Sequence, residues 1–148
     1  MVKEEKIVVY TDGGSRGNPG PSGVGVVIAK EKGQVIKEYS QNIGNRTNNE
    51  AEYEAVIFAL QKIRHLWGKR KTRDLNIEIR MDSELVCRQL AGKYKIVEEK
   101  LFPLFIKVWN LKMDFGKISF AEISREKNEE ADKLANQAID KKITKSMF

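Results

Sequence analysis

The sequence predicts an α/β domain in which helices pack against a mixed β-sheet, with the element order βββαβααβα. Three observations predict this fold. Three strand-like apolar runs come first and are separated only by short glycine-containing breaks, which favours antiparallel hairpins. Two further strand-like runs then alternate with helical patterns. The chain has 148 residues, which is the usual size of one domain.

The first half of the chain is expected to supply three strands and one long helix. The strands are predicted at residues 6–12 ("KIVVYTD"), 22–29 ("SGVGVVIA") and 34–43 ("QVIKEYSQNI"). The segment "TNNE" has the capping-box pattern, a hydroxyl residue followed three positions later by glutamate, which predicts that a helix starts at Thr47. This helix is expected to run to Trp67 and to end at Gly68.

The second half is expected to supply two strands and three helices. Residues 75–82 ("LNIEIRMD") alternate between apolar and polar side chains, which predicts the fourth strand. The elements expected after it are a short helix from Ser83 to Gly92, a longer helix at residues 98–115 with Pro103 in its first turn, a strand at residues 117–123 and a last helix from Asn128. We expect one domain, residues 1–140, followed by a loosely held basic tail, residues 141–148.

The composition is that of an ordinary globular protein with a basic balance. The formal charge is +6 and the pI is near 9.4, which suits a polyanionic partner such as nucleic acid but is weak evidence by itself. Cys87 is the single cysteine, which excludes an internal disulfide and a cysteine metal cluster and favours a reducing, cytoplasmic location. No apolar run approaches the roughly 18 residues of a membrane span, and "MVKEEK" lacks the layout of a secretory signal. No obligate partner is evident, so we expect a monomer.

Four carboxylates occupy unusual places in these elements. Asp12 and Asp82 lie where apolar strands are expected to end, and parallel neighbouring strands would bring them together at one edge of the sheet. Glu52 precedes an apolar helical stripe formed by Ala55, Val56, Ala59, Ile63 and Leu66. Asp132 similarly precedes Ala135 and Ile139 on the last helix.

The four acids are open to two interpretations. Each one taken singly is a helix cap, a turn former or a surface charge more often than a ligand. Taken together, they are acids that begin or end inward-facing elements, and carboxylates that lie close together need a cation to hold them ionised. Oxygen-only ligands select Mg²⁺ first and Mn²⁺ second, which favours metal-assisted phosphoryl transfer.

Four segments resemble the ribonuclease H family, type 1, in the family's own order: "YTDGGSRGNPGPSGVGVVI", "RTNNEAEYEAVIFAL", "MDSELV" and "SREKNEEADKLANQAI". The resemblance implies the ribonuclease H-like fold, with a five-stranded mixed sheet flanked by helices. It implies that Asp12, Glu52, Asp82 and Asp132 bind two divalent ions, Mg²⁺ or Mn²⁺ as a substitute. It also implies hydrolysis of the RNA strand of RNA–DNA hybrids, with 5′-phosphate and 3′-hydroxyl products.

The resemblance also implies a set of substrate contacts. Gly13 and Gly14 would let the backbone approach the substrate. Asn18, Asn48 and Asn49 would donate or accept hydrogen bonds in the minor groove, where 2′-hydroxyls distinguish RNA from DNA. Arg46 and Thr47 are candidates for a phosphate contact. A purely structural role in the helix cap is the alternative for Asn48 and Asn49.

The sequence departs from the family pattern in the loop before Asp132. Many members carry a histidine there, whereas the loop "EISREKNEEAD" has none. Arg125 or Glu126 is the candidate to replace it, although arginine does not act as a base at neutral pH. The single histidine, His65, lies about 20 Å along the first helix from Glu52 and is not expected to be catalytic.

The resemblance is to a short form of the family, with neither a hybrid-binding domain nor a basic protrusion. Lys93, Tyr94 and Lys95 are either contacts to the DNA backbone or part of a solvated linker. The basic stretch "RHLWGKRKTRD" is expected to be a solvated loop far from the acids, and Cys87 is expected to be buried. Two alternatives to the hybrid-specific nuclease stay open: a hybrid-binding module without activity, and a nuclease of the same fold that cuts double-stranded RNA or DNA.

Overall fold

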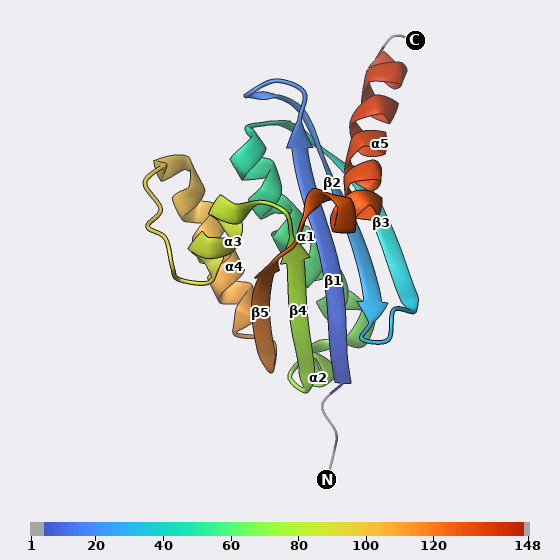
Figure 1. The fold of residues 1–148 in the computed structure, drawn as a ribbon, viewed down its shortest axis with the longest axis vertical. Helices are drawn as coiled ribbons and strands as arrows, with labels where there is room; N and C mark the ends of the chain where they lie inside the picture. The colour runs from blue at the N-terminus through green and yellow to red at the C-terminus, as the bar shows by residue number, and fades with distance from the viewer. Residues whose placement is uncertain (1–4, 147–148) are drawn as a thin grey trace.

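The computed structural model describes residues 5–146, which form one five-stranded sheet with helices on both faces (Figure 1). The strand order across the sheet is β3-β2-β1-β4-β5. The strands are β1 (Glu5–Ser15), β2 (Gly20–Lys30), β3 (Val35–Arg46), β4 (Leu75–Met81) and β5 (Lys117–Glu122). β1, β2 and β3 pair antiparallel, whereas β4 pairs parallel with both β1 and β5. The predicted mixed sheet is therefore confirmed.

The helices divide between the two faces of the sheet. They are α1 (Asn48–Trp67), α2 (Lys69–Thr72), α3 (Glu84–Leu90), α4 (Phe102–Lys112) and α5 (Glu129–Ser146), with two short 3₁₀ helices, η1 (Glu99–Leu101) and η2 (Arg125–Asn128). α1 packs on β1 and β2, and α4 packs on α1. α5 covers the opposite face, against β1, β2 and β3 (Figure 1).

The main hydrophobic core lies between α1 and the sheet. The inward side chains of β4 are buried at alternate positions, as the period-two pattern predicts: Leu75, Ile77, Ile79 and Met81. They pack with Ile7 and Val9 of β1 and with Leu60 and Ile63 of α1. Cys87 is buried in the same core, as predicted. Leu66 was expected on the buried stripe of α1 but is 44% exposed in its last turn.

The start of α1 is fixed by the predicted capping box. The Thr47 hydroxyl oxygen accepts a hydrogen bond from the Glu50 N–H at 3.2 Å, and the Glu50 carboxylate accepts one from the Thr47 N–H at 2.9 Å. The other end is also where the sequence predicts it, because the Gly68 N–H closes the last turn on the Arg64 carbonyl. The position of every α1 side chain relative to the sheet follows from this start.

Four segments differ from their predicted secondary structure or extent. β1 does not end at Asp12 but continues through Ser15, because Gly13 and Gly14 keep their antiparallel pairing with β2. The helix expected at residues 98–115 begins as the 3₁₀ turn η1 and ends as α4 at Lys112. The basic stretch expected to be a loop contains the short helix α2, in which Thr72 is buried.

The fourth difference concerns the C-terminal segment. α5 continues as helical backbone through Ser146, so most of the predicted tail extends the last helix. Residues 147–148 lie outside the described part of the chain. Within residues 5–146, none of the helices combines the length and the apolar character that a membrane span requires.

Candidate active site

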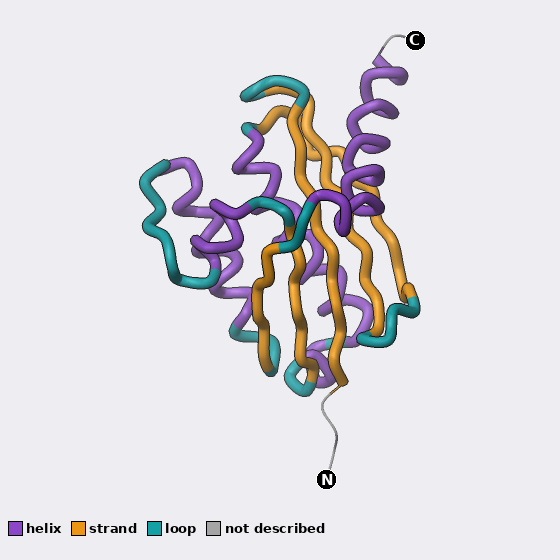
Figure 2. The backbone as a smooth tube through the Cα atoms, in the orientation of Figure 1, coloured by secondary structure: helices purple, strands orange, loops and turns teal. Residues whose placement is uncertain are grey.

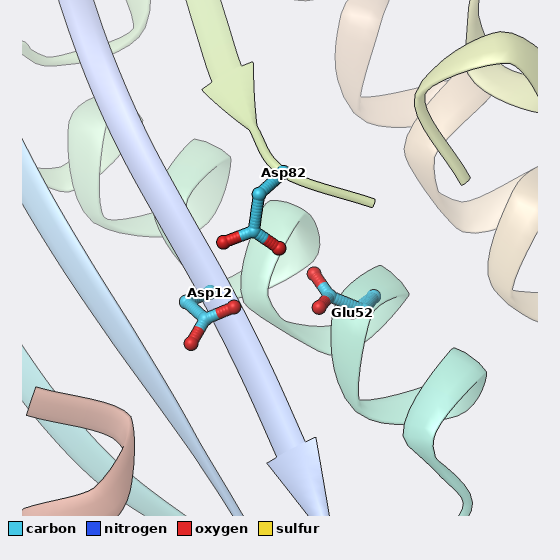
Figure 3. Close-up of side chains that lie close together, drawn as sticks. All are labelled: Asp12, Glu52 and Asp82. Carbon is cyan, nitrogen blue, oxygen red and sulfur yellow. The ribbon is translucent and has the colours of Figure 1, made fainter. Parts of the chain in front are cut away.

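Three carboxylates from three different elements converge at one edge of the sheet (Figure 3). Asp12 comes from β1, Glu52 from α1 and Asp82 from the segment that follows β4. Each offers one oxygen atom, and these oxygen atoms all lie within 4.8 Å of one another. Asp12 is 7% exposed, and the Oε2 atom of Glu52 is buried without a hydrogen-bond partner. The described residues thus contain a compact, oxygen-only cluster.

Parallel strand pairing brings the two aspartates together. The register of β1 and β4 places Tyr10 opposite Arg80, where their pairing ends. Asp12 and Asp82 each follow two residues later, so both carboxylates lie just beyond the last paired positions. The sequence predicted this neighbourhood, although Asp12 lies inside β1 and not at its end.

The close approach of α1 to β1 brings in Glu52. A Cβ atom at Gly13 would lie 2.0 Å from the Ala51 carbonyl oxygen and 2.6 Å from the Glu52 nitrogen. Only glycine leaves room for this approach. The second turn of α1 therefore lies directly against the strand next to Asp12, and Glu52 points at the two aspartates (Figure 3).

Asp132 borders the same site but is not part of the tight cluster. It lies in the first turn of α5 and is exposed. The four acids share one cleft of about 440 Å³, whose remaining lining residues are Gly13, Gly14, Asn48 and Arg125. The four predicted acids thus line one cleft, where three of them have oxygen atoms within 4.8 Å of one another and the fourth, Asp132, is exposed at the rim.

The electrostatics of the cluster are those of crowded, buried carboxylates. The pKa of Asp12 is raised from 3.8 to about 8, chiefly by burial and then by the charges of Asp82 and Asp132. The pKa of Glu52 is raised well above its usual value, also chiefly by burial and then by Asp12 and Asp82, while the Gly13 N–H opposes the shift. A hard divalent cation would reverse both shifts, because it compensates the negative charge and supplies a partner for the buried oxygen of Glu52.

The predicted asparagines hold the loop after β1 against the start of α1. The Ser15 N–H donates to Asn48 Oδ1 at 3.0 Å, and the Asn48 N–H donates to Asn18 Oδ1 at 3.0 Å. The loop after β1 and the start of α1 lie at the same end of the sheet (Figure 2). Asn49 contacts Glu98 at 3.5 Å. The structural role considered for Asn48 and Asn49 is therefore present, and the side chain of Asn48 still borders the cleft.

The other predicted substrate residues lie at different distances from the acids. Gly13, Gly14, Asn48 and Arg125 line the cleft, whereas Asn18, Arg46, Thr47, Asn49, Lys93 and Lys95 do not. Lys93 and Lys95 are exposed on the loop after α3. Arg46 is also exposed, and its carbonyl oxygen accepts a hydrogen bond from the Ser15 hydroxyl at 2.8 Å.

Sequence reasoning missed Asn128, which reaches the acid cluster from the end of η2, directly before α5. It is 1% exposed, and its Nδ2 donates to the Thr11 carbonyl oxygen at 2.9 Å and to Asp82 Oδ2 at 3.1 Å. One signal was available, since Asn128 was predicted to begin the last helix and lies only four residues before Asp132. Its contact with β1 is not evident from the sequence.

Comparison with known proteins agrees with the fold. A family model described as reverse transcriptase-like matches residues 10–138. The ribonuclease HI of Halobacterium salinarum is 38% identical over 91% of this chain and 65% of its own length. The bifunctional protein Rv2228c of Mycobacterium tuberculosis is also 38% identical over 91% of this chain, but the chain spans only 36% of that protein.

A solved structure matches along nearly its whole length. LC11-RNase H1, isolated from compost by a metagenomic approach, has 50% sequence identity and a TM-score of 0.88, covering 94% of this chain and 99% of its own. The same protein in complex with an RNA/DNA hybrid matches with 49% identity and the same TM-score, covering 93% of this chain and 99% of that one. The predicted ribonuclease H-like fold is thereby confirmed. The chain belongs to the ribonuclease H family, type 1.

Proposed function

We propose that this protein is a divalent-metal-dependent endoribonuclease that hydrolyses the RNA strand of RNA–DNA hybrids. The observation that carries the proposal is the cluster of Asp12, Glu52 and Asp82, whose oxygen atoms lie within 4.8 Å of one another in an open cleft. A protein that only binds hybrids has no need of buried, mutually repelling acids at this position. The hybrid complex of LC11-RNase H1, with 49% identity, supports the choice of substrate.

The acids of the cleft would hold two Mg²⁺ ions, with Mn²⁺ as a substitute. An oxygen atom of Asp12 lies within 4.8 Å of oxygen atoms of both Asp82 and Glu52, which suits a ligand shared by both ions. Asp132 at the rim would complete the second ligand set. When bound, the ions supply an activated water and stabilise the leaving 3′ oxygen, so that the products carry 5′-phosphate and 3′-hydroxyl ends.

The remaining lining residues would position the hybrid. Gly13 and Gly14 present backbone without side chains beside Asp12, so a phosphodiester can approach the acids closely. Asn48 borders the cleft, and because its Oδ1 already accepts from the Ser15 N–H, its Nδ2 group is the part that would donate to a ribose 2′-hydroxyl. Arg125 supplies a positive charge at the rim for phosphate.

More distant residues would extend the contact along the duplex. Asn18, Arg46, Thr47 and Asn49 flank the cleft at the start of α1 and suit the RNA strand, whereas Lys93 and Lys95 are exposed on the loop after α3 and suit the DNA backbone. A single copy of the chain supplies all four acids of the cleft, and we propose that the protein acts as a monomer. Sedimentation velocity of the protein with and without hybrid would test this.

Cleavage of a labelled RNA–DNA hybrid tests the proposed function. The assay compares Mg²⁺, Mn²⁺ and EDTA, with single-stranded RNA and double-stranded RNA as parallel substrates and the Asp12→Asn variant as the control. Metal-dependent cleavage of the hybrid's RNA strand alone, lost in Asp12→Asn, is the expected result. Tight hybrid binding without cleavage would favour a binding module. Cleavage of double-stranded RNA at a similar rate would favour a less selective nuclease.

A further inference from the structure

Asn128 lies at the junction of three segments that carry acids of the cleft. It is the last residue of η2 and directly precedes α5, with only 1% of its surface exposed. Its Nδ2 donates to the carbonyl oxygen of Thr11, the residue before Asp12, at 2.9 Å. The same Nδ2 donates to Oδ2 of Asp82 at 3.1 Å. One buried amide group thus joins β1, the end of β4 and the start of α5.

The two acceptors determine which way the amide group of Asn128 points. If the amide were reversed, its Oδ1 would face a carbonyl oxygen and a carboxylate oxygen, and neither can donate a hydrogen bond. In the observed orientation Oδ1 is buried and has no partner among the described residues. A buried acceptor without a partner costs stability. The two hydrogen bonds that Nδ2 donates therefore explain the asparagine at this position, because the oxygen of the same amide group has no partner.

Helix capping does not explain Asn128 either. An asparagine directly before a helix ordinarily accepts a hydrogen bond from an N–H group of the first turn through its side-chain oxygen. Here the Oδ1 atom accepts none, and the Nδ2 side of the amide is directed at the sheet. The side chain links the helix to the acids and does not close the helix itself.

We propose that Asn128 is a positioning residue for the metal ligands, an inference that rests on the proposed metal-dependent function. By donating to Oδ2 of Asp82, it fixes the rotation of that carboxylate and leaves Oδ1 for an ion. By donating to the Thr11 carbonyl, it holds the backbone next to Asp12. Because Asn128 directly precedes α5, the same anchor also holds the start of the helix whose first turn carries Asp132. Hydrogen-bond partners of metal ligands typically control metal affinity in this way.

Two substitutions of Asn128 and one distant control test this role. Asn128→Leu removes both donations at similar volume and also removes the unpartnered oxygen, and Asn128→Ala removes the side chain. Thr72→Val is the control, because Thr72 is also fully buried, and its hydroxyl bonds the carbonyl oxygens of Lys69 and Asp114. Thr72 precedes β4, about 20 Å from Asp82 at the far end of that strand.

Mn²⁺ binding measured by calorimetry on the whole protein without substrate is the first readout. We expect the Asn128 variants to bind Mn²⁺ about 10- to 100-fold more weakly than the wild type. We expect Thr72→Val to melt at a lower temperature yet to bind Mn²⁺ with an unchanged Kd. In hybrid cleavage at fixed Mn²⁺ concentration, the Asn128 variants should lose kcat while the KM for hybrid stays within about twofold, since Asn128 is buried and offers no surface to the duplex.

The outcomes separate this inference from the proposed function. A folded Asn128→Leu protein with wild-type Mn²⁺ affinity and kcat would overturn the positioning role, even if the wild type cleaves hybrids. Weaker Mn²⁺ binding in the Asn128 variants, with no hybrid cleavage by the wild type, would support the positioning role and overturn the proposed function. If both Asn128 variants are unfolded while Thr72→Val folds, the residue serves the fold alone and the inference is wrong.

Discussion

Replacing the carboxyl group of Asp12 by an amide, Asp12→Asn, is expected to flatten the pH dependence of stability in the metal-free protein. The folded-state pKa of Asp12 is about 8, against 3.8 for the ordinary side chain. A carboxyl group with a raised folded-state pKa contributes stability that is fully present below pH 3.8 and is lost as the pH rises toward 8. Within this window the folded protein keeps a proton that the unfolded chain releases.

The size of this pH dependence follows from the number of protons that the protein releases when it unfolds. Between pH 5 and pH 7 the wild-type protein should lose about 1.4 kcal/mol of unfolding free energy per pH unit through Asp12, or about 2.7 kcal/mol in all. The amide group introduced by Asp12→Asn does not titrate, so the variant should lack this loss. Glu52 acts in the same direction, because part of the rise in its pKa comes from Asp12 and disappears with it. Other titrating groups are common to both proteins and cancel in the difference.

Urea unfolding at pH 5, 6 and 7 in EDTA measures this difference. The slope of unfolding free energy against pH should be more negative in the wild type than in Asp12→Asn by about 1.4 kcal/mol per pH unit, which corresponds to about one proton released on unfolding. Saturating Mn²⁺ should stabilise the wild type at pH 7 and leave Asp12→Asn nearly unchanged, because the variant lacks a central ligand. Equal slopes in the two proteins would refute the buried-carboxylate argument.

Three further predictions concern the surroundings of the acids. Gly13→Ala should lower the free energy of unfolding by about 3 kcal/mol in urea titrations, because its Cβ would lie 2.0 Å from the Ala51 carbonyl oxygen. Gly14→Ala is the control, since a Cβ atom at Gly14 meets nothing within 4 Å. Equal stability of the two variants would contradict this. Arg125→Ala should lower the kcat of hybrid cleavage and reduce hybrid affinity only slightly, since Arg125 borders the cleft and offers one phosphate contact among several. An unchanged kcat would remove it as a replacement for the family histidine. His65→Ala should keep the wild-type kcat, because α1 separates His65 from Glu52 by about 20 Å; a large drop would be inconsistent with the site described.

The predictable part of the site depends on local patterns. Asp12 and Asp82 were identified because apolar strand patterns lead into them, and Glu52 because it precedes the apolar stripe of α1. The capping box at Thr47 and the glycine stop at Gly68 located α1, because both signals act within a few residues of the chain. The resemblance of four segments to one family assigned these acids a shared role.

Local patterns failed where a distant segment decides the outcome. Gly13 and Gly14 suggested the end of β1, but pairing with β2 carries the strand on to Ser15. Gly13 and Gly14 stay in the strand because they pair with Val24 and Gly23 of β2. These partners lie beyond the loop between the two strands, so a pattern within β1 does not reveal them. The last helix was also predicted to end near residue 140, whereas the helical backbone of α5 continues through Ser146.

The sequence by itself determined the α/β class, the order of the elements and the identity of the four acids, because hydrophobic period, capping residues and turn residues are read over short distances. Only the tertiary structure decided that three of the acids lie within 4.8 Å of one another while Asp132 stays at the rim. It also decided that Asn128 reaches across to Thr11, more than a hundred residues away in the chain. Strand register and the depth at which α1 packs on Gly13 set these distances, and both arise from contacts between segments far apart in the sequence.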